Sequence, residues 1–152
     1  FGMPPSRALA VMQGLSGELE EVDVEGYRPF LLQSDAAKDF PLAPDVVHLL
    51  PHFDCYLIGC HPRDRLVPPA WASRVLTRGA IGNLPLLVID GIVAGLWKQQ
   101  RAGKRIEIRA EPFEPLATGQ QRELEAAAAR IGEIVEAESA LALGAVDARP
   151  HL

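Results

Sequence analysis

An Asp-Gly pair between two apolar runs constrains the fold of this chain more than any other feature. Leu84 to Ile89 and Ile92 to Lys98 flank Asp90-Gly91, a pair typical of a two-residue type I′ turn because both residues tolerate a positive φ. After a second turn, apolar and charged side chains alternate from Arg105 to Phe113, which is the period of a strand. The sequence therefore predicts a three-stranded antiparallel meander.

One long helix is predicted after the meander. Residues rich in Ala and Glu run from Thr118 to about Leu143, with apolar side chains at helical spacing that indicate a face packed on the sheet. Gly132 is expected to weaken this helix by about 1 kcal/mol relative to Ala, and Gly144 to end it. The tail to Leu152 is expected to fray.

The first 44 residues have the pattern of a helix followed by a hairpin. A helix is predicted from Pro5 to Leu15, with proline in its first turn. Glu18 to Val24 and Tyr27 to Leu32 then flank a turn at Glu25-Gly26. This order is typical of the back half of a winged helix, and residues 33–44 are predicted to add a short helix and a linker.

The middle of the chain has weaker signals. Val46 to Leu50 has a strand-like pattern, residues 53–58 fit a strand or a helix, and residues 62–69 are rich in turn formers. A short helix is predicted from Pro69 to Leu76 and a loop from Gly79 to Asn83. We therefore expect two parts, residues 1–44 and residues 45–152.

Composition favours a globular chain in a reducing compartment. The chain is 48% hydrophobic and 23% charged, and its apolar runs fall short of the roughly 20 residues of a membrane span, so no membrane partner is expected. Two cysteines provide no disulfide framework, which favours the cytoplasm. The start at Phe1, without an initiator Met or a signal peptide, suggests a fragment of a longer protein.

The charge is unevenly distributed. The net charge of -5 argues against binding nucleic acid through bulk electrostatics alone. Residues 1–60 hold three Lys/Arg against nine Asp/Glu, residues 61–109 nine against three, and residues 110–152 three against eight. One basic block thus lies between two acidic ones.

The segment LLPHFDCYLIGCHPRDR places charges inside an apolar run. An unpaired buried ion costs several kcal/mol, so these charges must be paired, hydrogen-bonded or exposed. We expect Asp54 and Asp64 to be partners that orient arginines.

Metal binding and catalysis have weak support in this segment. His52, Cys55, Cys60 and His61 are zinc-ligand types, but burial of the residues between them would point neighbouring ligands apart. The simpler interpretation is two buried thiols and two partly exposed imidazoles. An acid–base pair of Asp54 with His52 or His61 is indicated more weakly still. No nucleophile motif or phosphate loop occurs in the sequence, so no metal, no cofactor and no catalytic residue is predicted.

Nucleic-acid binding has better support. The basic block contains cations with two interleaved tryptophans, Trp71 and Trp97; its cations include Arg63, Arg65, Arg74, Arg78, Lys98, Arg101, Lys104 and Arg105. The alternative for the last three is a hairpin tip kept soluble by charge. Against DNA binding, the first hairpin carries five acidic residues from Glu18 to Glu25 and only Arg28 to offset them.

Four motifs together resemble the winged-helix DNA-binding-domain-containing proteins, whose best-studied branch comprises bacterial DNA glycosylases that unhook interstrand crosslinks. They are EVDVEGYRPFLL, LLPHFDCYLIG with RDR, PLLVIDGIVAGLWK and EPFEPL. The resemblance implies an α+β fold: a partial winged helix (helix plus hairpin) over residues 1–44, then an antiparallel β-barrel-like meander with a long C-terminal helix over residues 45–152.

The resemblance also implies a function in DNA repair. The full-length protein would be a DNA-binding glycosylase, but the family's catalytic Gln motif lies near the N-terminus of the whole protein, so this fragment is expected not to catalyse. Its implied partners are DNA and the rest of the same polypeptide. We predict Arg63, Arg65, Lys98 and Arg101 as phosphate-facing residues. The alternative is a structural or dimerisation module, as a homodimer without direct DNA contact.

Overall fold

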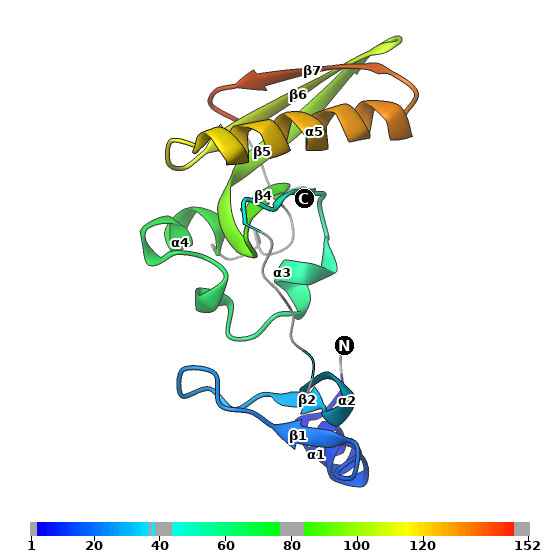
Figure 1. The fold of residues 1–152 in the computed structure, drawn as a ribbon, viewed down its shortest axis with the longest axis vertical. Helices are drawn as coiled ribbons and strands as arrows, with labels where there is room; N and C mark the ends of the chain where they lie inside the picture. Colours follow the sequence, from blue (N-terminus) through cyan, green and yellow to red (C-terminus); the bar gives the residue numbers. More distant parts are fainter. Residues whose placement is uncertain (1–2, 37, 39–43, 77–83, 148–152) are drawn as a thin grey trace. The chain divides into compact units, whose positions relative to one another are not determined.

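A sheet of five strands is the largest element in the part of the chain that the computed structural model describes, which is residues 3–36, 38, 44–76 and 84–147 (Figure 1). Its strands lie in the order β3-β4-β5-β6-β7. They are Val47–Leu50, Leu86–Ile89, Ile92–Ala102, Arg105–Pro112 and Glu138–Leu143. Contacts divide the chain into two units, Phe1–Leu42 and Ala43–Leu152, and the sheet belongs to the second.

The predicted meander is confirmed as β4, β5 and β6, which pair antiparallel. Asp90 and Gly91 have φ of 50° and 82°, which are the two positive values that a type I′ turn requires. At the second turn Gly103 has a φ of 62°, where glycine carries no steric penalty. Ile106 and Ile108 are buried on one face of β6, while Glu107 between them is exposed.

The closing helix is shorter than predicted. The helix α5 spans Thr118–Ile134, and Glu138–Leu143 forms β7, parallel to β6, so Leu141 lies on a strand and the predicted helix is wrong there. Pairing with the edge of β6 outweighs the helical preference of the Ala-Leu sequence. Gly132 has a packing role: a Cβ there would lie 2.7 Å from Cβ of Ser139. The glycine allows β7 to pass close to α5.

The α+β class is confirmed, but the barrel-like description is wrong. The strands β3 and β7 form opposite edges of the sheet instead of closing it, and the β6–β7 pair is parallel. A barrel would need these two edge strands to pair with each other. The sheet is therefore open and mixed.

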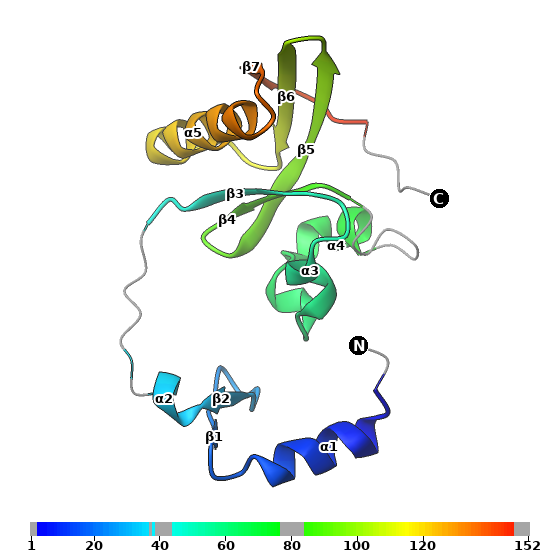
Figure 2. The ribbon, with the colours of Figure 1, turned by 90° about the vertical axis from the view of Figure 1, so that its right-hand side faces the viewer.

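Helices cover both faces of this sheet (Figure 2). On one face Leu124 and Ala128 of α5 pack in a core with Trp97 and Ile108, so the predicted packing of this helix is confirmed. On the other face two short helices, α3 (Cys55–Gly59) and α4 (Pro69–Val75), contribute to a second core through residues such as Leu57. The helix α3 resolves the strand-or-helix ambiguity at residues 53–58.

The first unit contains the predicted helix and hairpin. The helix α1 spans Pro5–Gly14, and the strands β1 (Leu19–Glu21) and β2 (Phe30–Leu32) pair antiparallel, followed by α2 (Gln33–Ala36). None of the described residues 3–36 is buried. Its apolar side chains therefore have little protein to pack against within this unit.

Three predicted segments lie wholly or partly outside the described residues: part of the linker at 39–43, the loop at 79–83 and the tail from residue 148. Among the helices of the described residues, none has the length and apolar character to cross a membrane.

Candidate nucleic-acid interface

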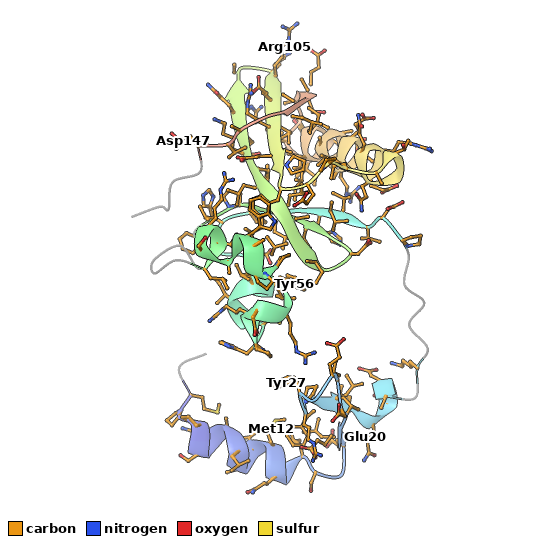
Figure 3. All side chains as sticks on the ribbon, turned by 90° about the vertical axis from the view of Figure 1, so that its left-hand side faces the viewer. Met12, Glu20, Tyr27, Tyr56, Arg105 and Asp147 are labelled. Carbon is orange, nitrogen blue, oxygen red and sulfur yellow. The ribbon has the colours of Figure 1, made fainter. Side chains whose placement is uncertain are left out.

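The β5–β6 hairpin carries the most exposed cations of the sheet. Arg101, Lys104 and Arg105 are all exposed at its tip, where Figure 3 labels Arg105. Arg101 Nε donates to the Gly103 carbonyl at 3.0 Å, and Arg105 Nε lies 3.3 Å from Glu138 Oε2. Since the Arg105 pair is highly exposed on both sides, it holds its charges weakly. The tip can offer cations to an anionic partner.

The predicted contacts Lys98 and Arg101 lie on opposite faces of the sheet. Residues three apart on a strand point in opposite directions. Arg101 pairs in register with Ile106, which packs on the α5 side, while Lys98 pairs with Arg109. Arg109 in turn pairs with Glu107 at 2.7 Å. Lys98 and Arg101 therefore project from opposite faces of the sheet.

Arg63 and Arg65 lie elsewhere, in a 3₁₀ turn that spans Arg63–Arg65 after α3. Arg63 Nε donates to the Leu57 carbonyl at 3.2 Å, and its Nη2 donates to the Ile58 carbonyl at 3.1 Å. These carbonyls belong to the end of α3, where they lack partners within the helix. Arg63 therefore stabilises the helix terminus, and its predicted DNA contact stays a prediction, as does that of Arg65.

Asp54 caps the N-terminus of α3, the helix whose last carbonyls accept from Arg63. Its Oδ1 accepts from the Tyr56 N–H at 2.8 Å, as an N-cap residue does. The Tyr56 hydroxyl donates to the Gly91 carbonyl at 2.8 Å, which joins α3 to the β4–β5 turn. Burial raises the pKa of Tyr56, with a smaller contribution from Cys60. Asp64, by contrast, is exposed in the 3₁₀ turn.

The two tryptophans do not form a platform for bases. Trp97 is only 5% exposed, and its Nε1 donates to the Leu50 carbonyl at 2.8 Å, so it belongs to the core. Trp71 stacks on Phe113 with ring centroids 4.5 Å apart. The expected interleaving of aromatic and basic residues is therefore wrong for Trp97. Burial of a large aromatic side chain stabilises the fold more than its exposure to solvent does.

A charged network that sequence reasoning missed joins α4 to β6. Arg74 donates to both carboxylate oxygens of Glu111 at 2.8 Å, and the Val146 N–H donates to Glu111 Oε2 at 2.6 Å. The hydrogen bonds from Arg74 lower the pKa of Glu111, and the same pair raises the pKa of Arg74. The alternation of β6 showed only that Glu111 faces away from α5. Its partners come from segments distant in sequence.

The Cys and His residues do not assemble. Cys55 is exposed and Cys60 is half-buried, and both are free. Within the ranges that the structure describes, no three His, Cys, Asp or Glu side chains are grouped so that they could hold a metal.

Comparison with known proteins gives a consistent result. The model of the family described as DNA glycosylase AlkZ-like matches residues 1–134. An interstrand DNA cross-link repair glycosylase of Streptomyces sahachiroi is 36% identical over 85 residues, which are 55% of this chain and 23% of that protein.

A solved structure agrees with the sequence match. The Streptomyces sahachiroi DNA glycosylase AlkZ superimposes with a TM-score of 0.66 at 27% identity, over 92% of this chain and 38% of that one. The chain thus spans well under half the length of these relatives. Because the family match covers most of its residues, the chain belongs to the AlkZ-like DNA glycosylase family.

Proposed function

We propose that this chain is the DNA-contacting C-terminal part of a DNA-repair glycosylase. The observation that carries the proposal is the family match over residues 1–134, and the sequence match and the solved structure, both from Streptomyces sahachiroi, are named as DNA glycosylases. Exposed cations at the β5–β6 hairpin tip support a role in holding the phosphate backbone. In this proposal residues 1–44 are the end of a winged-helix domain and residues 45–152 are the sheet unit.

Catalysis is assigned to the rest of the full-length protein. The sequence contains no nucleophile motif, and within the described residues no three His, Cys, Asp or Glu side chains are grouped as a metal site. The chain would contribute binding and orientation of damaged DNA, so phosphate contacts should weaken when its exposed cations are removed.

The test uses duplex DNA that carries an interstrand crosslink. The full-length protein should release the crosslinked base and leave an abasic site, which alkaline cleavage and gel electrophoresis detect. The 152-residue chain should leave the crosslink intact. A full-length protein with neither DNA binding nor base release would contradict the proposal.

A second candidate rests on the surface of the first unit. Leu9 is 56% exposed, Phe30 49% and Leu32 47%, which is unusual for large apolar side chains gathered in one small unit. A protein-interaction module that forms a homodimer would cover them. Light scattering that finds a dimer, with no retardation of DNA at low salt, would favour this function over DNA contact.

A further inference from the structure

Within the described residues, one edge of β5 has no strand partner along its second half. The pairing of β4 with β5 reaches Leu96, whereas β6 pairs with β5 as far as Ala102. The last contact on the β4 side is the Trp97 N–H, which donates to the Pro85 carbonyl at 3.2 Å. From Lys98 onward, β5 has β6 on one side and no described strand on the other.

Backbone donors point out of this edge. Hydrogen-bonding groups two residues apart on an antiparallel strand point to the same side. Because the Trp97 N–H points toward β4, the N–H groups of Gln99 and Arg101 point the same way, into the open edge. The Ala94 carbonyl accepts from the Phe113 N–H at 2.8 Å. The backbone groups of the even-numbered residues of β5 therefore point toward β6.

A hollow of about 300 Å³ lies at the start of this edge, lined by Pro51, His52, Pro85, Trp97, Lys98 and Gln99. Its lining includes no carboxylate. The Trp97 bond to Leu50 fixes the end of β3, and Pro51 and His52 follow directly. Three of its lining residues, Trp97, Lys98 and Gln99, lie on β5, and Lys98 is the cation among them.

The cations on the two faces flank the same edge. Lys98 lies on one face and Arg101 on the other, so a group seated at the edge between them can be reached from both. Lys98 also pairs in register with Arg109, and like charges directly opposite each other destabilise a sheet. Glu107 already pairs with Arg109 at 2.7 Å, so the argument for an anion rests on Lys98 and Arg101.

We propose that the open edge of β5 binds phosphates of the DNA backbone. The Gln99 N–H donates to a phosphate oxygen, Lys98 and Arg101 approach it from the two faces, and His52 lines the hollow. Backbone N–H groups, Lys and Arg are common phosphate contacts. This inference rests on the proposed DNA-contacting function. A peptide strand could also use such an edge, but the cations and the absence of carboxylates from the hollow favour phosphate.

The experiment removes one backbone donor. In the full-length protein, Gln99→Pro deletes an N–H that the ladder with β6 does not use, a position where strands tolerate proline. Gln99→Ala keeps that N–H and is the matched control. Fluorescence anisotropy with a labelled duplex should show an affinity about tenfold lower in Gln99→Pro than in Gln99→Ala, with thermal midpoints that agree. Lys98→Gln should reduce the slope of log affinity against log salt by about 0.9.

The outcomes separate the two proposals. If Gln99→Pro and Lys98→Gln both bind like the wild type while Lys104→Gln weakens binding, the edge site is overturned and the DNA function stands. If the wild-type protein does not bind DNA, both fail. If Gln99→Pro does not fold, the salt slope of Lys98→Gln decides the question, and an unchanged slope overturns the site.

Discussion

Arg74 and Glu111 form a two-pronged ion pair, with both nitrogen–oxygen distances at 2.8 Å. The pair joins α4 to β6, and its carboxylate also accepts from the Val146 N–H. Arg74 lies over the Phe113 ring at 5.5 Å. One carboxylate thus ties three separate segments to the same place on the sheet.

This pair should make stability depend on pH. The folded protein holds the pKa of Glu111 below its usual value, chiefly through the Arg74 hydrogen bonds. The ion pair therefore contributes to the free energy of unfolding at pH values above about 4.3, the pKa of Glu111 in the unfolded chain. This contribution is lost as the pH falls from that value toward the lower pKa of Glu111 in the folded protein. At pH 7, Glu111→Gln should lower the unfolding free energy by about 1–2 kcal/mol. Urea unfolding should show the difference from wild type shrinking below pH 4.3; a constant difference would contradict it.

Substitution of Gly132 should destabilise the protein. Helix propensity alone predicts that a Gly→Ala substitution in α5 raises the free energy of unfolding by about 1 kcal/mol. A Cβ at Gly132 would instead lie 2.8 Å from the Ala137 carbonyl oxygen and 2.7 Å from Cβ of Ser139, so Gly132→Ala should lower the thermal midpoint. Ala126→Gly, on the exposed face of α5, is the control that measures propensity alone. A raised midpoint in Gly132→Ala would show that β7 does not pack closely there.

Asp45 and Gly119 should be energetically coupled. A Cβ on Gly119 would lie 2.0 Å from Asp45 Oδ2, which places the carboxylate at the first turn of α5, where the helix dipole favours negative charge. Asp45 has a φ of 62°, so Asp45→Gly removes the carboxylate without backbone strain. Gly119→Ala should be more favourable by about 0.5–1 kcal/mol in the Asp45→Gly background. Additive effects in the double-mutant cycle would contradict this contact.

Substitution of Arg63 should lower the stability of the folded protein, in addition to any effect on DNA binding. Arg63→Gln removes the donors for the Leu57 and Ile58 carbonyls and should lower the unfolding free energy by about 1–2 kcal/mol. Chemical denaturation measures this loss. The neighbouring Asp64→Asn, at an exposed position, is the control and should change stability by less than about 0.5 kcal/mol. Equal stability in both variants would remove the structural role of Arg63.

The local parts of the fold were predictable from the sequence. The Asp90-Gly91 turn depends on the backbone freedom of two adjacent residues, and the alternation along β6 depends on nearest neighbours. The strand β7 was not predictable, because Glu138–Leu143 pairs with β6 across an intervening helix. An Ala-Leu sequence alone favours a helix.

The candidate interface was predictable only in part. Sequence reasoning found the basic block and predicted that Lys98 and Arg101 face phosphate, but it did not assign them to faces of the sheet, and the strand register places them on opposite faces. It also placed Trp97 beside the cations, where the structure buries it. The pairing of Arg74 with Glu111 joins residues 37 positions apart, and no local pattern indicates such a contact.

The salt dependence of DNA affinity tests the central claim most directly. In the full-length protein, Arg101→Gln combined with Lys104→Gln removes two exposed hairpin cations, and Arg122→Gln with Arg130→Gln removes two exposed cations from α5. If the hairpin contacts DNA, the first variant should lower the slope of log affinity against log salt by up to about 1.8, and the second should leave it unchanged. Equal slopes in the wild type and both variants would contradict DNA contact by this hairpin.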